Sequence, residues 1–206
     1  KYYESAVELE RLAKECADHP VGKQAADGVK KLLSDPARKR EVDAGRQLAA
    51  QHSHSLEVWY AHVPGLRVVV PATIDDARGL LRAALASPDP VIIFEPISLY
   101  NMDGDLTEAA SSVQLEGARV HRPGSDVTLV TYGASLWRCV AAAEALAAGG
   151  IEAEIVDLRS LRPLDDATIL ASVRKTRRVV IVDEGRRTCS LSAEIAMRIM
   201  EQGFYD

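Results

Sequence analysis

The sequence predicts an α/β protein with a separate α-helical segment at its amino end. From about Gly45 onward, short β-rich apolar runs alternate with stretches of helical spacing. Between residues 124 and 206 this alternation gives three strand–helix units in succession, which indicates a parallel sheet with crossover helices. The basic residues change at the same place, because six lysines lie in residues 1–43 and only Lys175 lies in residues 44–206. Residues 1–43 are therefore interpreted as a separate unit, with a different origin or a separate structural history.

Composition excludes several classes of protein. With 206 residues, 47% of them hydrophobic and 27% charged, the chain can bury a substantial core. A net charge of −5 gives no global positive field for nucleic acid or anionic lipid. The longest apolar runs, such as 91–94 and 179–182, are far shorter than the roughly 20 residues of a membrane helix. Three cysteines without CxxC spacing, Cys16, Cys139 and Cys189, favour a cytoplasmic location over a disulfide or zinc framework.

The first 43 residues are expected to be helical. Apolar residues recur at helical spacing from Tyr2 to Cys16 and again from Val21 to Leu32, and His19-Pro20 separates the two stripes. Asp35-Pro36 suits a helix cap followed by a first helical residue. A small docking module is one interpretation. We favour a helical hairpin that packs on its neighbour.

Residues 44–123 are expected to form part of one domain and a connection. A helix over 56–63 ends at Pro64-Gly65, and a buried strand follows over 67–70. Thr73 and Asp76 resemble a capping box for a helix over 74–86, and a second strand covers 91–94. Residues 98–123 have few periodic apolar positions and read as an interdomain connection.

Residues 124–206 are expected to form a second domain of regular alternation. The predicted strands cover 127–132, 153–158 and 179–182, and the predicted helices cover 135–148, 165–173 and 191–200. Asp183-Glu184-Gly185 follows the last strand, at the edge where open α/β sheets usually bind ligands. We favour a structural role for these carboxylates over a second active site.

The densest cluster of polar groups is Gln51-His52-Ser53-His54-Ser55, at the start of the helix over 56–63. Free backbone N–H groups at a helix start favour an anionic ligand, and an imidazole titrates near neutral pH. The alternative is that Ser53 or Ser55 caps the helix and His54 is a solvated polar residue. Metal binding is less favoured, because no carboxylate or thiol lies nearby at ligand spacing.

Three segments resemble a known family: AGRQLAAQHSHSLEVWYAHVPGL at 44–66, VVVPATIDDARGL at 68–80 and PVIIFEPISLY at 90–100. They look like the β subunit of the thiamine-diphosphate-dependent decarboxylating component of 2-oxoacid dehydrogenase complexes, which act on pyruvate or branched-chain 2-oxoacids. GSDVTLVTYG, EIVDLRSLRPLD and VDEG continue the match in residues 124–206. The resemblance implies parts of two transketolase-like domains, each a parallel-sheet αβα unit: a partial pyrimidine-binding domain at 44–102, a linker at 103–123 and an incomplete carboxyl-terminal domain at 124–206.

The resemblance also implies roles for particular residues. His52 falls where the family has its active-site histidine, and Ser53 and His54 fall beside it as substrate-binding positions. A donor that titrates near neutral pH suits the charge that develops on a 2-oxoacid. The family's potassium site implies three ligand positions just after the helix over 74–86, and they are Ala84, Ser87 and Asp89.

Departures from the family pattern imply dependence on other residues. The family's glutamate that contacts the aminopyrimidine has no counterpart in residues 1–43, and no cofactor-binding residue can be assigned. Thiamine diphosphate and magnesium are expected to be held mainly by an α subunit and by that segment. Asp103-Gly104-Asp105 is read as a turn and not as the diphosphate motif. We therefore expect this chain alone to be inactive.

Two classes of function stay open at this point. The first is an enzyme subunit for oxidative decarboxylation of a 2-oxoacid, working in an α2β2 assembly that passes the acyl group to the lipoyl arm of an acyltransferase component. The second is a non-catalytic fragment that acts in subunit assembly or acyltransferase docking. A sugar-type transketolase relative is less favoured, because Gln51-His52-Ser53 matches the dehydrogenases.

Overall fold

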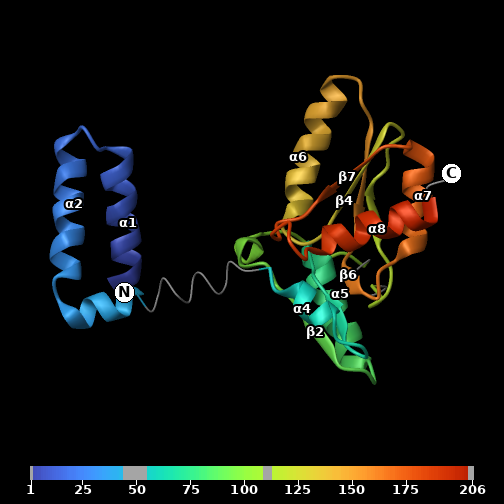
Figure 1. Ribbon diagram of the computed structural model, residues 1–206, viewed down its shortest axis with the longest axis horizontal. Coiled ribbons are helices and arrows are strands. Elements are labelled where there is room, and N and C mark those ends of the chain that lie inside the picture. The colour runs from blue at the N-terminus through green and yellow to red at the C-terminus, as the bar shows by residue number, and fades with distance from the viewer. Residues whose placement is uncertain (1, 44–54, 109–112, 204–206) are drawn as a thin grey trace. The chain divides into compact units, whose positions relative to one another are not determined.

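The computed structural model describes residues 2–43, 55–108 and 113–203 of the chain. They fall into two compact units, residues 1–54 and 55–206, and each unit is described by itself below (Figure 1). Among the described residues, no helix combines the length and apolar character that a membrane span requires.

The first unit consists of helices, as the sequence predicts. Helix α1 (Tyr2–Glu15) and helix α2 (Pro20–Leu33) are antiparallel neighbours, and residues 36–43 are also helical (Figure 1). His19 begins α2 because its Nδ1 accepts the Val21 N–H at 3.3 Å. Asp35 caps the following helical turn, since its Oδ1 accepts the N–H groups of Ala37 and Arg38 at 2.8 and 3.2 Å.

Small residues bring the helices of the first unit together. Ala6, Ala25 and Val42 are buried. A Cβ atom added to Gly22 would lie 1.9 Å from the carbonyl oxygen of Cys16, so only glycine fits where the first turn of α2 meets the segment after α1. The unit thus has a small core of its own.

The second unit contains two sheets and their covering helices. Its first part comprises α4 (Glu57–Ala61), β1 (Arg67–Val69), α5 (Ile74–Ala86), β2 (Val91–Ile93) and the 3-10 turn η1 (Ile97–Leu99). The remainder comprises β3 (Arg119–Arg122), β4 (Val127–Thr131), α6 (Ser135–Ala148), β5 (Ala153–Asp157), β6 (Ser160–Arg162), α7 (Asp166–Thr176), β7 (Val179–Val182) and α8 (Leu191–Gly203).

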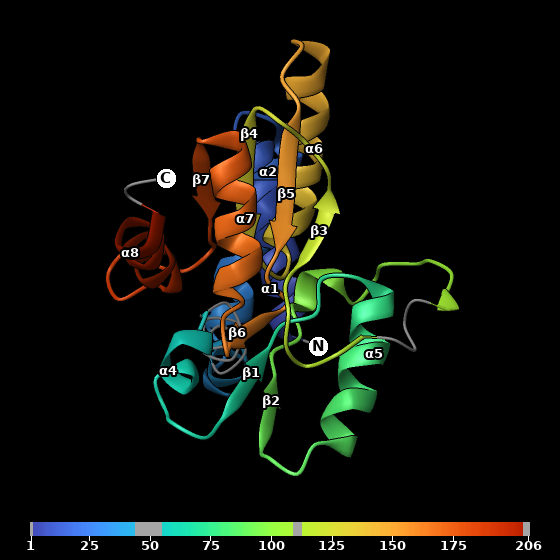
Figure 2. The same ribbon diagram turned by 90° about the vertical axis from the view of Figure 1, so that its right-hand side faces the viewer.

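The strand order explains how the two parts of this unit join. The four-stranded sheet has the order β3-β5-β4-β7, in which β4 lies parallel to both β5 and β7. The three-stranded sheet has the order β2-β1-β6, with β1 parallel to β2 (Figure 2). Strand β6 follows β5 in the chain but pairs antiparallel with β1, so one short segment connects the two sheets. The α/β fold class is confirmed.

Two strands depart from the sequence prediction. Strand β3 pairs antiparallel with β5 inside the segment expected to be an interdomain connection, and β6 was not predicted. Both are short: β3 is Arg-Val-His-Arg at a sheet edge with its first two residues exposed, and β6 is Ser-Leu-Arg. A strand of three or four residues carries too few alternations to show a period of two.

The sheets share one hydrophobic core. Val68 and Val70 from the β1 segment pack in the same cluster as Val130, Val156 and residues of α7 and α8. On the opposite face, α6 packs on β4 and β5 through Leu136, Cys139 and Ala143. Figure 1 shows α6 on one side of the four-stranded sheet and α7 and α8 on the other.

Candidate functional site

The predicted catalytic positions His52, Ser53 and His54 lie outside the described residues. Helix α4 (Glu57–Ala61) is the first described element that follows them in the chain. The Ala61 carbonyl accepts a hydrogen bond from the Arg162 guanidinium at 2.8 Å, which joins α4 to β6. The Tyr60 ring lies 5.5 Å from the Phe94 ring at the end of β2. These contacts hold α4 beside the first sheet.

The amino end of α4 lies near the carboxyl end of β7. Burial raises the pKa of Glu57, and the charges of Asp183 and Glu184 raise it further. The Asp183 carboxylate accepts hydrogen bonds from the Tyr132 hydroxyl at 2.8 Å, the Gly185 N–H at 2.6 Å and the Ser192 N–H at 3.2 Å. Because these three donors occupy both carboxylate oxygens, Asp183 acts as a structural link between β4, β7 and α8.

A cavity opens at the carboxyl ends of β1 and β2. Its volume is about 200 Å³, and Pro71, Ala72, Pro96 and Leu99 contribute to its apolar walls. Its polar rim includes Glu95, whose carboxylate accepts the Tyr100 hydroxyl at 3.0 Å. This is the edge at which parallel α/β sheets present ligand-binding groups.

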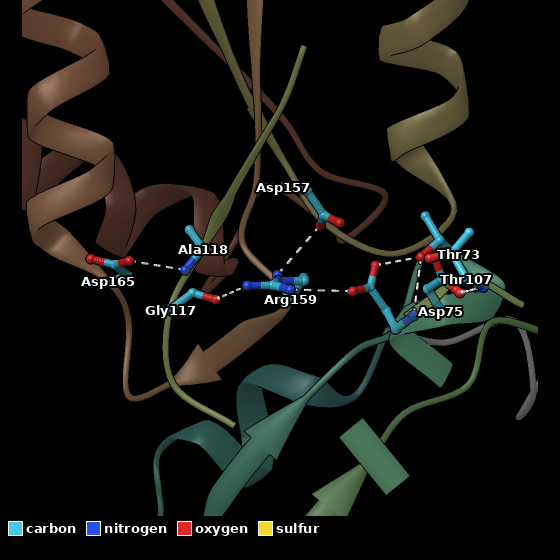
Figure 3. Close-up of polar contacts among 9 residues, drawn as sticks. Thr73, Asp75, Thr107, Gly117, Ala118, Asp157, Arg159 and Asp165 are labelled. Atoms are coloured by element: carbon cyan, nitrogen blue, oxygen red, sulfur yellow. Dashed lines mark hydrogen bonds and ion pairs between the residues drawn. The ribbon is translucent and has the colours of Figure 1, made fainter. Parts of the chain in front are cut away.

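A polar network joins the amino end of α5 to the segment between β5 and β6 (Figure 3). Thr73 begins α5, because its hydroxyl accepts the Asp76 N–H at 3.1 Å and donates to the Asp76 carboxylate at 2.6 Å. The same carboxylate faces the Arg159 guanidinium at 3.3 Å. Arg159 also donates to the Gly117 carbonyl at 3.0 Å. Asp76 is fully buried, so this ion pair links α5 to the second domain in a place shielded from water.

Two further hydrogen bonds hold the segment that connects the domains, one through Ala118 and one through Thr107. Asp165 accepts the Ala118 N–H at 2.9 Å and also caps α7, where it accepts the Thr168 N–H at 3.0 Å. Asp75, at the start of α5, accepts the Thr107 N–H at 2.8 Å (Figure 3). The connecting segment is therefore tied to α5 at one end and to α7 at the other.

The three predicted potassium positions lie close together at the carboxyl end of α5: Ala84 in its last turn, and Ser87 and Asp89 just after it. The Ser87 N–H donates to the Ala84 carbonyl at 3.1 Å, and the Asp89 N–H donates to the Ser87 hydroxyl at 3.2 Å. The Asp89 carboxylate pairs with the Arg67 guanidinium at 3.1 Å, and Arg67 also contacts Glu116. The oxygens of a cation site are thus present, but Asp89 already faces one positive charge. A cation would have to share that carboxylate or use the carbonyl oxygens.

The described residues provide no cluster of three or more His, Cys, Asp or Glu side chains that could hold a metal ion. A magnesium diphosphate needs such oxygen ligands, so this part of the chain does not by itself fit that portion of the cofactor.

Sequence reasoning missed the roles of Asp157 and Arg159. Asp76 was identified as a capping residue, which the structure confirms, but its ion pair with Arg159 spans 83 positions of sequence. One local signal existed: Asp157 lies at the end of a predicted buried strand and Arg159 directly follows that strand, at the sheet edge where polar groups gather.

Comparison with known families identifies both domains. Residues 40–102 match the family "Transketolase, pyrimidine binding domain", and residues 116–206 match "Transketolase, C-terminal domain". Among solved structures, "Split gene transketolase, inactive beta4 tetramer" superposes with a TM-score of 0.62 at 27% identity, covering 71% of this chain and 47% of that one.

The similar curated proteins are β subunits of pyruvate dehydrogenase E1 components and of an acetoin oxidoreductase. The pyruvate dehydrogenase E1 component subunit beta of Rhizobium meliloti is 46% identical over 162 residues, which is 78% of this chain and 35% of that protein. The acetoin:2,6-dichlorophenolindophenol oxidoreductase subunit beta of Cupriavidus necator is 45% identical over 163 residues, covering 79% of this chain and 48% of that protein. The mitochondrial pyruvate dehydrogenase E1 subunit beta of Drosophila melanogaster is 45% identical over 168 residues, covering 79% of this chain and 46% of that protein.

The chain spans less than half the length of each of these relatives. Within that span, the two transketolase-like domains occur in the order that the sequence predicted. Residues 40–102 and 116–206 therefore carry parts of the transketolase pyrimidine-binding and carboxyl-terminal domains, and over this span the chain resembles β subunits of the decarboxylating components of 2-oxoacid dehydrogenases.

Proposed function

We propose that residues 44–206 act as the β-subunit part of a 2-oxoacid dehydrogenase decarboxylating component. The reaction is oxidative decarboxylation of a 2-oxoacid, pyruvate or a branched-chain acid, with acyl transfer to a lipoyl group. The observation that carries this proposal is the 46% identity over 162 residues to a pyruvate dehydrogenase E1 subunit beta, because one alignment covers residues of both domains.

Thiamine diphosphate would supply the carbon nucleophile, and an α subunit would hold most of its diphosphate and magnesium. In this chain, His52 would lie nearest the reacting carbon and donate a hydrogen bond to the oxygen on which negative charge develops. Ser53 and His54 would contact the substrate carboxylate or orient the loop. The contacts of α4 with Arg162 and Phe94 support a fixed exit for this loop on its carboxyl side.

Potassium at Ala84, Ser87 and Asp89 would have a structural role in this proposal. It would stabilise the turn after α5, where their N–H and oxygen atoms already bond one another. The proposed assembly is an α2β2 heterotetramer in the cytoplasm that docks an acyltransferase component. The net charge of −5 gives the chain no global positive field that would attract nucleic acid or anionic lipid.

Acetoin cleavage is a second candidate activity. The relative from Cupriavidus necator that is named for acetoin is 45% identical, nearly as similar as the pyruvate dehydrogenase relative. Both activities would use the same half of a shared site. A non-catalytic assembly or docking fragment is the alternative from another class.

Reconstitution with an α subunit tests these candidates. The chain is mixed with α subunits of pyruvate-, branched-chain- and acetoin-type enzymes, together with thiamine diphosphate, magnesium and an artificial electron acceptor. We expect turnover of one 2-oxoacid with one matching α subunit. Turnover of acetoin alone would favour the second candidate. A stable complex with no turnover on any substrate would favour the docking fragment and contradict the catalytic proposal.

A further inference from the structure

Two buried polar atoms without a hydrogen-bond partner lie at the junction of the domains. They are Asp157 Oδ2 and Arg159 Nε, and the third such atom in the described part of the chain is His121 Nδ1. Buried polar groups in folded proteins are nearly always paired, so such atoms call for a chemical explanation. Asp157 ends β5, and Arg159 precedes β6, where the chain passes from one sheet to the other.

The buried environment of Asp157 disfavours the ionised form of its carboxyl group. The residue is fully buried, and its Oδ1 accepts one hydrogen bond, from the Arg159 backbone N–H at 3.3 Å. The guanidinium of Arg159 donates its hydrogen bonds to Asp76 and to the Gly117 carbonyl instead of to Asp157 (Figure 3). Two fully buried carboxylates, Asp76 and Asp157, thus lie near one guanidinium.

The charged and titratable groups that act on Asp157 come from several elements, and His121 of β3 interacts in turn with Arg119 and Asp76. Asp76 faces it from α5 and opposes its ionisation, whereas Arg159 and Arg119 favour it. Arg119 lies opposite Asp157 in the β3–β5 pairing. Cys139 faces it from α6, and the pKa of that thiol is raised chiefly by burial. Burial is the largest effect at Asp157 and, with the charge of Asp76, raises the pKa of its carboxyl group from 3.8 to about 7.

We propose that Asp157 is a proton-binding site that controls the junction between the two domains. With a proton on Oδ2 the carboxyl group is neutral, so the buried pair of acids carries a single charge that Arg159 balances. Loss of the proton leaves a second buried charge beside Asp76. The repulsion acts on the segment that holds β6 against β1, where the Arg159 carbonyl accepts the Val70 N–H at 2.7 Å.

The direction of the pH effect follows from the two pKa values. The folded-state pKa lies above the unfolded value of 3.8, so the folded protein binds the proton more tightly. The stabilisation is fully present below about pH 4 and is lost as the pH rises through about 7. The junction is expected to be tighter at pH 6 than at pH 8.

Thermal unfolding of the full chain between pH 5.5 and 8.5 tests the proton site. Asp157→Asn keeps the shape of the neutral acid. Its advantage over the wild type in melting temperature should grow from pH 5.5 to pH 8.5 and reach at least about 3 °C at pH 8.5. Glu154→Gln is the control, because Glu154 is also buried but receives hydrogen bonds from Ser172 and Gly124. It should lower the melting temperature at every pH.

Two results would overturn the proton site. One is a lower melting temperature for Asp157→Asn at pH 8.5, as in the control, which would mean that Asp157 is ionised and paired. The other needs no variant: carbon-13 NMR of the wild-type carboxyl group would report a pKa near 4.

Hydrogen exchange tests the effect on the junction. At pH 8 the Val70 amide should exchange faster in the wild type than in Asp157→Asn, and at pH 6 the difference between the two rates should be smaller. The Phe94 amide, which donates to the Val69 carbonyl at 2.9 Å in the β1–β2 pairing, serves as the internal control and should not respond to the variant. Equal Val70 rates in both proteins at pH 8 would overturn the control of the junction. None of these readouts depends on enzymatic activity.

Discussion

Asp76 shows how much of a residue's role is local. Its position three residues after Thr73 predicts a capping interaction, and the structure places both hydrogen bonds of that cap. Its pairing with Arg159 depends on how two domains meet, and no spacing in the sequence encodes that. Local chemistry was therefore predictable at this residue, whereas its long-range partner was not.

His52 is the residue on which the proposed chemistry depends most. In an assembly of this chain with an α subunit, His52→Ala should lower turnover about a hundredfold, the scale for loss of one electrostatic stabiliser. His54→Ala should have a much smaller effect. Steady-state decarboxylation rates, with circular dichroism as the check on folding, provide the measurement. Equal losses in the two variants would mean that the loop has a structural role and that another group is catalytic.

Asp89 tests the proposed cation. Its ion pair with Arg67 is half-exposed, so screening by water leaves it with little effect on stability. If potassium binds here, Asp89→Ala should lower the melting temperature more in potassium buffer than in a buffer of a large organic cation. Glu116→Ala removes the other carboxylate contact of Arg67 and serves as the control, with the same small shift in both buffers. An identical shift for Asp89→Ala in both buffers would remove potassium from this site.

At the scale of elements, the length of a helix or strand determined whether the sequence pattern could predict it. Helices α5 and α6 begin and end where the periodicity predicts, because thirteen and fourteen residues give several turns of pattern. Strands β3 and β6 have four and three residues and were missed. Strand β6 is nonetheless the element that joins the two sheets, so the connection between the domains depends on the segment with the weakest sequence signal.

The two glycines of α2 test the packing of the first unit. Alanine is the better helix former by about 1 kcal/mol, so both substitutions favour the helix locally. A Cβ atom at Gly28 would meet only the Leu9 side chain, at 3.3 Å, whereas one at Gly22 would overlap the Cys16 backbone at 1.9 Å. Gly22→Ala should therefore destabilise this unit by about 1–3 kcal/mol, and Gly28→Ala should be within about 1 kcal/mol of the wild type.

Circular dichroism and tryptophan fluorescence separate the two units in this experiment. Both tryptophans, Trp59 and Trp137, belong to the second unit, so their fluorescence reports its unfolding alone. Gly22→Ala should lower the helical transition and leave the fluorescence transition in place. Similar melting temperatures for the Gly22 and Gly28 variants would contradict the close approach of Gly22 to the Cys16 backbone.

At the scale of the whole molecule, the fold class and the two-domain arrangement were predictable, but the complete site was not. Alternating strands and helices identify the α/β class, and the segment around Gln51-His52-Ser53 identifies the family. The chain spans 35% of the relative from Rhizobium meliloti and 48% of the relative from Cupriavidus necator. The remaining groups of the proposed site would come from an α subunit and from segments that correspond to the unmatched parts of these relatives. A shared site cannot be reconstructed from one partner's residues.

The central claim is that this chain supplies one part of a cofactor site that an α subunit completes. Calorimetric titration with thiamine diphosphate and magnesium tests it most directly, with the chain alone, the α subunit alone and the mixture compared at the same concentrations. We expect weak binding to each chain alone and one tight site per αβ pair in the mixture. Tight stoichiometric binding to this chain alone, or no gain in affinity on mixing, would contradict the claim.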